Sequence, residues 1–195
     1  IIDDKIDLMD IAKIYDEIGV SCFSILTDEK YFNGNLNDLI NLRKKTKTPI
    51  LRKEFIVDEY QVYESFISGA DCILIILSMI NVDLAMKIEN VAISLGLDAI
   101  IEVHDEKEMN EAIKFKSNLI GINNRNLKNF TVDINNAIRI ANSVNTDKIL
   151  ISESGINSRN AIDRTMSNSN INTFLIGESL MKSDDLSREF NNLVN

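Results

Sequence analysis

The sequence is poor in cysteine and histidine: its 195 residues include two cysteines and one histidine. Small extracellular scaffolds held together by disulfides are much richer in cysteine. Cys22 and Cys72 both lie in apolar, strand-like runs, so we interpret them as reduced residues of the core. The single histidine, His104, cannot by itself form a metal site of several His and Cys ligands, and we expect it at the surface or a rim. These scarcities favour a cytoplasmic protein.

Long apolar runs are also lacking. The longest, residues 72–77, has the size of a strand and is far shorter than the ~18 residues that a membrane span needs. The first four residues include two aspartates and lead into no apolar stretch, unlike a secretory signal. The net charge of −9 argues against a general nucleic-acid binder, which needs a basic face. A local site for a small anion remains compatible with this charge.

Seven short β-rich runs alternate with helical stretches. They span residues 21–26, 50–54, 72–77, 99–103, 119–122, 149–152 and 173–176. They begin roughly 20–30 residues apart, which is the length of one βα unit. Most are apolar almost throughout, as strands of a parallel sheet are when helices cover it. We therefore predict a parallel α/β architecture.

Capping residues and glycines mark the ends of the predicted helices. Asp58, Asn81, Asp105, Asp133, Asn157 and Ser183 precede helical runs. Gly19, Gly69 and Gly96 stand just after helices, where a left-handed residue is needed. Gly121, Gly155 and Gly177 are expected at the carboxyl ends of strands, where a ligand can approach the backbone.

Seven strand–helix units of this size predict a (βα)8 TIM barrel that lacks one strand, as a single domain over residues 1–195. An open, doubly wound sheet is the alternative. The first predicted element, residues 7–18, is a helix with no strand before it. We therefore expect a barrel that is truncated at its N-terminus.

Polar side chains gather directly after the apolar runs. They are Asp28, Glu29 and Lys30; Arg52, Lys53 and Glu54; Glu102 and His104; Asn123, Asn124 and Arg125; and Glu153 and Ser154. In a barrel, the loops at the carboxyl ends of the strands converge on one mouth. Buried there, Lys53, Glu102 and Glu153 could compensate one another's charges, as general acid–base catalysis requires. The alternative is that these residues simply meet solvent where the strands end.

The last two predicted strands are followed by SESGI (152–156) and LIGESLM (175–181). A glycine at this place exposes backbone N–H groups, and a nearby helix N-terminus adds the positive end of its dipole. Barrels often bind phosphate at the corresponding loops. The two segments therefore predict a phosphate site.

Five segments resemble the motifs of the indole-3-glycerol-phosphate synthase family. They are SILTDEKYFNG (24–34), PILRKEFIVDEYQ (49–61), GINNRNL (121–127), SESGI and FLIGESLM (174–181). They occur in the family's order and spacing, and the resemblance covers essentially the whole chain. The first two are long and specific, whereas the last two are shared with other phosphate-binding barrels.

The resemblance implies closure of the pyrrole ring of indole-3-glycerol phosphate in tryptophan biosynthesis. The substrate would be 1-(2-carboxyphenylamino)-1-deoxyribulose 5-phosphate, which loses CO2 and water. The implied enzyme is a carbon–carbon lyase, a carboxy-lyase, that uses no metal and no organic cofactor. Its partner would be this small phosphorylated substrate. Some members of the family are fused to other tryptophan-pathway domains, so such a fusion or association stays open.

The resemblance also assigns roles to residues. Lys53 matches the general acid that protonates the substrate ketone, and Glu102 matches the carboxylate of the later proton transfers. Asn123 and Glu153 match residues that hold the substrate hydroxyls. The implied binding residues are Phe32, Phe55 and Leu74 around the anthranilate ring, Arg125 beside Asn123, and Ser154, Gly155, Gly177 and Glu178 in the phosphate loops. Many relatives have serine in place of Glu178, which puts a side-chain contact to phosphate in doubt there.

One departure from the family concerns the start of the chain. The family's first strand ends in a Glu-x-Lys pair and an SPS(K)G loop, and this sequence begins after that loop. Two alternatives therefore stay open. Another phosphate-binding barrel, such as phosphoribosylanthranilate isomerase, would explain SESGI and FLIGESLM but not the RKEF and TDEKYF motifs. The other alternative is an inactive, non-catalytic fragment.

Overall fold

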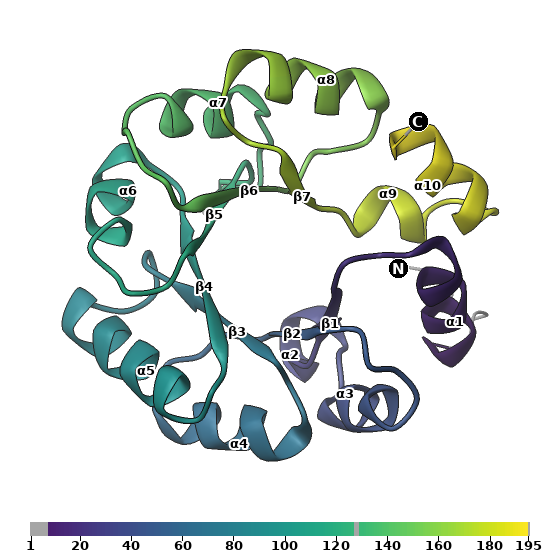
Figure 1. Ribbon diagram of the computed structural model, residues 1–195, viewed down its shortest axis with the longest axis horizontal. Helices are drawn as coiled ribbons and strands as arrows, with labels where there is room; N and C mark the ends of the chain where they lie inside the picture. The colour runs from purple at the N-terminus through teal and green to yellow at the C-terminus, as the bar shows by residue number, and fades with distance from the viewer. Residues whose placement is uncertain (1–7, 127–128, 195) are drawn as a thin grey trace. The chain divides into compact units, whose positions relative to one another are not determined.

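The computed structural model describes residues 8–126 and 129–194 (Figure 1). Two sequence expectations fall outside these residues: Asp7, the predicted start of the first helix, and Leu127, the last residue of GINNRNL. In the described part of the chain, no helix is both long and apolar enough to cross a membrane.

The described residues form seven strands in one sheet. The strands are β1 (Phe23–Leu26), β2 (Ile50–Lys53), β3 (Cys72–Ile76), β4 (Asp98–Val103), β5 (Leu119–Asn123), β6 (Ile149–Glu153) and β7 (Thr173–Leu175). Their order in the sheet is their order in the chain, and β1–β2–β3 and β5–β6–β7 pair in parallel. An open doubly wound sheet reverses its order at a switch point, so the sequential order excludes that alternative.

The predicted strands are confirmed, and each predicted bound lies within two residues of the observed one. One prediction about a strand end is wrong. Gly121 lies inside β5 and not at its end, because β5 continues to Asn123. The polar Asn123 is compatible with a strand position because it is buried and hydrogen-bonded.

The chain divides into two compact units, which we describe separately. The N-terminal unit comprises residues 8–101 and 115–117. The C-terminal unit comprises residues 102–114, 118–126 and 129–194. The division passes through β4, which contributes its first four residues to one unit and Glu102 and Val103 to the other.

The N-terminal unit contains five helices among its described residues. They are α1 (Leu8–Ile18), α2 (Glu29–Phe32), α3 (Leu36–Arg43), α4 (Tyr60–Ser68) and α5 (Val82–Ser94). Figure 1 shows α3, α4 and α5 along one side of β1–β3. Phe23, Ile25 and Ile50 of the strands pack there against Leu39 and Leu42 of α3. Removing these apolar side chains from water stabilises the unit.

Two local predictions in this unit have different outcomes. Gly19, Gly69 and Gly96 all adopt the left-handed conformation predicted after helices, with φ of 77°, 91° and 77°. Both cysteines are free, but only Cys72 is buried. The core position predicted for Cys22 is wrong, because β1 begins at Phe23, two residues later than predicted, and Cys22 is exposed.

The C-terminal unit contains five further helices among its described residues. They are α6 (Glu106–Ala112), α7 (Asn135–Ala141), α8 (Arg159–Asn168), α9 (Glu178–Met181) and α10 (Leu186–Val194). Figure 1 shows α7 and α8 along one side of β5–β7. Asp105 caps α6 as predicted, by accepting hydrogen bonds from two backbone N–H groups. The cap of α8 is Ser158 and not the predicted Asn157.

Candidate functional site

Asn124 shows which way the polar side chains after β5 point. Its side chain accepts a hydrogen bond from the backbone N–H of Ala137 in α7, at 2.9 Å. It also donates to Ser152 Oγ and to the carbonyl of Ser154, both at 3.0 Å. Asn124 therefore faces α7. Because successive side chains of extended backbone point to opposite sides, Asn123 faces away from the helices.

Three of the predicted catalytic residues lie together on that second face of the C-terminal unit. Asn123 donates a hydrogen bond from Nδ2 to Oε1 of Glu102, at 3.0 Å. Asn123 is also the register partner of Glu153 in the β5–β6 pair, so their side chains share one face. All three are buried, with 2% of Glu102 and 1% of Glu153 exposed. We call Glu102, Asn123 and Glu153 the carboxylate cluster.

His104 extends the carboxylate cluster. Its Nε2 lies 3.2 Å from Glu102 Oε1, and its Nδ1 lies 3.3 Å from Glu108 Oε2. Burial alone would lower the pKa of His104, but hydrogen bonds and charges from Glu102 and Glu108 outweigh burial and raise it to about 9. The sequence predicted a surface or rim position, whereas only 14% of the side chain is exposed and two carboxylates enclose it.

In the N-terminal unit, Arg52 shows which way Lys53 points. The buried Arg52 guanidinium donates to Glu64 Oε2 at 2.7 Å and to Ser65 Oγ at 3.1 Å, both on α4. It also donates to Thr27 Oγ1 at 3.0 Å. Arg52 therefore faces α4, and the half-buried Lys53 faces the opposite side of β2.

Leu74 lies on the same face as Lys53. The register pairs Arg52 with Ile73, so the next position of each strand places Lys53 beside Leu74. Leu74 is 2% exposed. This face of β2 and β3 therefore brings an amine and a buried apolar side chain together.

Phe32 and Phe55 also meet within the N-terminal unit. Phe32 ends α2 and is exposed, and its ring centroid lies 5.8 Å from that of Phe55. Tyr31 packs edge-on against Phe55 at 6.0 Å. Glu54 fixes the start of this segment, because its carboxylate accepts from Thr27 Oγ1 at 2.6 Å and from the Phe55 N–H at 2.9 Å. The rings form a partly exposed aromatic surface.

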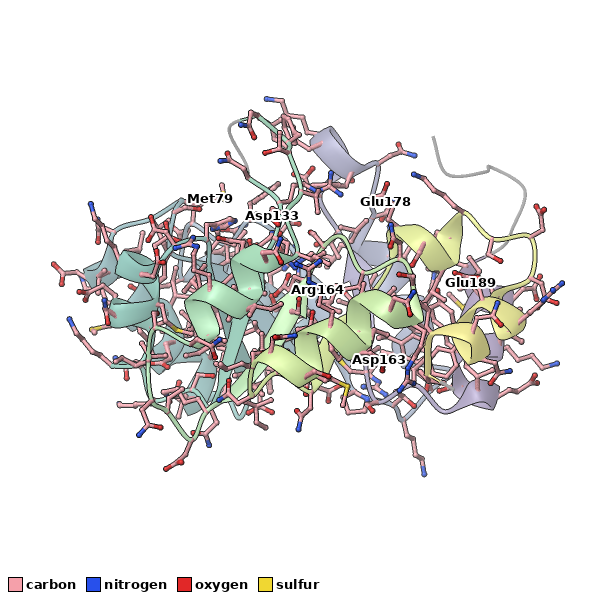
Figure 2. The ribbon with its side chains drawn as sticks, turned by 90° about the horizontal axis from the view of Figure 1, so that it is seen from above. Met79, Asp133, Asp163, Arg164, Glu178 and Glu189 are labelled. Atoms are coloured by element: carbon pink, nitrogen blue, oxygen red, sulfur yellow. The ribbon has the colours of Figure 1, made fainter. Side chains whose placement is uncertain are left out.

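A pocket of about 840 Å³ lies in the C-terminal unit. Its lining includes Arg125, Gly155, Ser158, Arg164, Glu178 and Lys182. Figure 2 labels Asp133, Arg164 and Glu178, which line it from the loop before α7, from α8 and from α9. Three basic side chains outnumber the two carboxylates of the lining, Asp133 and Glu178, and with the N-terminus of α8 they favour an anion here. We call it the anion pocket.

The loop after β6 has an unusual backbone. Ser154 and Gly155 are both left-handed, with φ of 65° and 79°. A Cβ at Gly155 would lie 2.4 Å from Cγ1 of Val132, so a larger residue would have to displace its neighbour. Gly155 lines the anion pocket, and Ser154 directly precedes it. A non-glycine residue in this conformation is strained, and such strain often accompanies a functional loop.

Glu178 at the start of α9 holds two of the basic side chains of the anion pocket. Lys182 Nζ lies 2.7 Å from its Oε1, and Arg125 Nη2 donates to its Oε2 at 2.8 Å. Hydrogen bonds from Lys182 and then from Arg125 lower the pKa of the Glu178 carboxyl. An anion in the pocket would therefore compete with the Glu178 carboxylate for Arg125. Gly177 directly precedes Glu178 and is exposed.

The comparisons with known proteins agree with the motifs. The family model described as "Indole-3-glycerol phosphate synthase" matches residues 1–193. The chain belongs to the indole-3-glycerol phosphate synthase family. Members of this family are carboxy-lyases of tryptophan biosynthesis that act on a small phosphorylated substrate. The match leaves the alternative isomerase without support.

Three relatives of that name show the extent of the similarity. The protein of Polaromonas naphthalenivorans (strain CJ2) is 44% identical over 177 residues, which are 90% of this chain and 66% of the relative. The Legionella pneumophila (strain Lens) protein is 43% identical over 188 residues, 96% and 72% of the two chains. The Burkholderia lata protein is 44% identical over 180 residues, 92% and 69%. The chain thus spans 66% to 72% of these relatives.

A solved structure described as "Native KDPGal structure" is similar in fold. Its TM-score is 0.69 at 9% identity, over 96% of this chain and 86% of the other. At this identity the likeness concerns the fold alone. The seven strands in sequential order, with helices between them, are those of the α/β TIM barrel, which is the fold of the indole-3-glycerol phosphate synthase family.

Sequence reasoning missed the supporting roles of Asn124 and Arg52. Both stand beside a predicted site residue in a motif of the synthase family, and both are buried on the helix side of their strand. Alternation along the strand could have revealed them, because two successive polar residues at a strand end cannot both face the same side. Asn124 ties the Ser154 loop to α7, and Arg52 ties the end of β2 to α4.

Proposed function

We propose that this protein is an active indole-3-glycerol phosphate synthase. It converts 1-(2-carboxyphenylamino)-1-deoxyribulose 5-phosphate to indole-3-glycerol phosphate, carbon dioxide and water. Membership of the family supports the reaction. The observation that carries the residue assignment is the buried hydrogen bond between Asn123 and Glu102, with Glu153 on the same face. Carboxylates buried in this way need a chemical reason, and proton transfer supplies one.

In this proposal Lys53 is the general acid of ring closure. The ring carbon that carries the carboxylate attacks the ketone carbon, and Lys53 gives its proton to the ketone oxygen. Loss of CO2 then restores the aromatic ring. The position of Lys53 beside the buried Leu74 supports the role, because it places an amine next to an apolar side chain that is proposed to contact the anthranilate ring.

Glu102 serves the dehydration that follows. The new hydroxyl takes up a proton and leaves as water, and the CH2 carbon between the nitrogen and the former ketone carbon loses a proton, which forms the double bond of the pyrrole ring; a carboxylate can carry out such transfers. The Asn123 amide holds Glu102 in one orientation through its hydrogen bond. Asn123 and Glu153 also hold the substrate hydroxyls. These assignments are supported by the shared face of the three side chains.

The remaining predicted residues bind the two ends of the substrate. Phe32, Phe55 and Leu74 contact the anthranilate ring. Arg125, Ser154, Gly155, Gly177 and Glu178 form the phosphate site, with Glu178 contributing through its backbone N–H. The carboxylate of Glu178 already accepts from Arg125 and Lys182, which supports a backbone contact and not a side-chain one.

The proposal includes several general expectations. Residues 1–195 belong to one barrel domain, and the protein is cytoplasmic. It needs neither a metal nor an organic cofactor and binds no nucleic acid. Fusion or association with other tryptophan-pathway enzymes is compatible with it. Amine and carboxylate groups suffice for every proton transfer in the sequence of steps above.

The test is a turnover assay on the purified full-length protein. Formation of indole-3-glycerol phosphate is followed by its indole fluorescence, with the substrate as the sole addition and with a metal chelator present in a parallel sample. We expect equal turnover in both samples. Absence of product, or product only without the chelator, would contradict the proposal. The same substrate without its phosphate serves as a control and should give a much higher KM.

A further inference from the structure

His104 is the one histidine of the chain, and it bridges two carboxylates within the C-terminal unit. Glu102 of β4 lies at one ring nitrogen and Glu108 of α6 at the other, at 3.2 and 3.3 Å. Nδ1 contacts the Glu108 carboxylate, and Nε2 lies close to the Glu102 carboxylate although outside hydrogen-bond geometry, so a cationic ring fits between these two charges better than a neutral one. The three side chains form a line of alternating charge that begins in the carboxylate cluster.

Hydrogen bonds hold the backbone of His104 as well as its ring. Its N–H donates to Glu108 Oε2 at 2.7 Å, so Glu108 binds both the backbone and the ring of the same residue. Asn136 of α7 donates to the carbonyl of His104 at 3.3 Å and to the carbonyl of Asn123 at 3.2 Å. The amide of Asn136 thus links His104 and Asn123, the two residues whose side chains lie beside the Glu102 carboxylate.

The charges that face His104 come from two elements. Glu102 approaches from β4 and Glu108 from α6, whereas α7 contributes the neutral amide of Asn136. Two further charged pairs involve these helices, Glu106 with Arg139 and Glu111 with Lys114, and each is internally compensated. An isolated buried carboxylate is costly, and a cation at hydrogen-bond distance offsets that cost. His104 therefore favours the ionised form of Glu102.

We propose that His104 is a positioning residue that keeps the Glu102 carboxylate ionised and aimed for the dehydration step, with Glu108 as its outer anchor. The inference rests on the proposed function, because it assigns a partner to the group that moves the proton there. When the imidazolium loses its proton, Glu102 loses its compensating charge. The rate of dehydration then falls although the substrate contacts are intact.

A purely structural role is the competing interpretation, in which His104 only joins the end of β4 to α6. The two interpretations differ in one measurable respect. A positioning role makes kcat depend on the protonation state of His104, whereas a structural role affects stability alone. Glu108→Gln separates them, because glutamine keeps an acceptor for the backbone N–H of His104 but removes the charge.

The first arm of the experiment measures His104 directly. Its imidazole gives a single set of histidine NMR resonances in protein purified without a histidine tag, so the titration is unambiguous. We expect a midpoint near pH 9 in the wild type. Glu108→Gln should move it about one pH unit lower, because one of two neighbouring charges is lost. Glu111→Gln, which removes a charge paired with Lys114 on the same helix, should leave it unchanged.

The second arm measures kcat and KM against pH for the same proteins. We expect the alkaline decline of kcat to move with the His104 titration in Glu108→Gln and to stay in place in Glu111→Gln. KM should change less than about twofold. In His104→Gln we expect kcat to fall about 10- to 100-fold at neutral pH and the alkaline decline near pH 9 to disappear, since loss of support for a catalytic group costs less than loss of the group itself.

Two results would overturn the inference: an alkaline decline of kcat that stays in place while the His104 titration moves, or normal kcat in a folded His104→Gln protein. Wild-type turnover separates this failure from failure of the proposed function. If the wild type forms no indole-3-glycerol phosphate, the proposed function fails and the positioning role fails with it. Normal wild-type turnover with either overturning result removes the role of His104 alone.

Discussion

The carboxylate cluster and the anion pocket belong to the same unit, yet their charges lie in opposite environments. Glu102 is 2% exposed and has an amide and an imidazole as partners. Glu178 is 57% exposed and has two basic side chains as partners. Water screens exposed ion pairs, whereas buried charges depend on each partner they have. Substitutions in the cluster should therefore act on chemistry, and substitutions in the pocket on substrate affinity.

The largest contrast is expected between Glu102→Gln and Arg125→Ala. Glu102→Gln removes a group that moves protons, so kcat should fall by ~10²–10⁴-fold with KM nearly unchanged. Arg125→Ala removes a cation from the anion pocket, so KM should rise ~10-fold or more while kcat changes little. Steady-state kinetics on both variants check this. A loss of kcat in Arg125→Ala as large as that in Glu102→Gln would show that the anion pocket also acts on the chemical step.

A smaller effect, on stability, is expected at the residue that joins the two regions. Asn124→Ala leaves the N–H of Ala137 and the carbonyl of Ser154 without their partner, which should cost about 2–4 kcal/mol of unfolding free energy. KM should rise as well, because the Ser154 loop loses its support. Asn142→Ala removes an exposed amide bound to the carbonyl of Asn168 and should cost less than about 0.5 kcal/mol.

Urea unfolding of the two asparagine variants measures these costs. Equal losses of unfolding free energy in Asn124→Ala and Asn142→Ala would mean that the buried hydrogen bonds of Asn124 stabilise the protein no more than the exposed one of Asn142. A normal KM in Asn124→Ala would mean that the loop of Ser154 and Gly155 keeps its conformation without the hydrogen bond from Asn124.

The smallest effect is expected for Glu178→Gln. The exposed ion pairs with Arg125 and Lys182 contribute less than about 1 kcal/mol to stability. Removing the carboxylate leaves Arg125 available to the phosphate, so KM should fall about two- to threefold and kcat should stay unchanged. Titration with inorganic phosphate as a competitive inhibitor gives a second readout. A higher KM in Glu178→Gln would show that the Glu178 carboxylate helps to hold the substrate.

The strands could be predicted from the sequence because burial on both sides leaves long apolar signatures, as in β3 (CILII). Their ends were less certain where a polar residue continues a strand, as Asn123 does in β5. Cys22 was misplaced for a related reason, since an apolar neighbourhood in sequence does not fix where the strand begins.

The partners of the site residues could not be predicted, because they depend on contacts between distant segments. Asn123 reaches Glu102 from another strand, and Asn124 reaches Ser154 thirty residues along the chain. A sequence pattern predicts on which face of a strand a side chain lies, but it does not predict the rotamer that forms a particular hydrogen bond. The same limit explains why a surface or rim position was predicted for His104, whose environment is set by two carboxylates.

The turnover of Lys53→Arg beside Lys53→Ala tests most directly whether the half-buried Lys53 is the general acid that acts with the buried carboxylates in indole ring closure. Arginine keeps the charge but holds its proton too tightly to donate it. We expect both variants to lose ~10²–10⁴-fold in kcat while substrate binding changes far less. Near-normal turnover in Lys53→Arg would contradict it, because Lys53 would then supply charge alone and the general acid would be another residue.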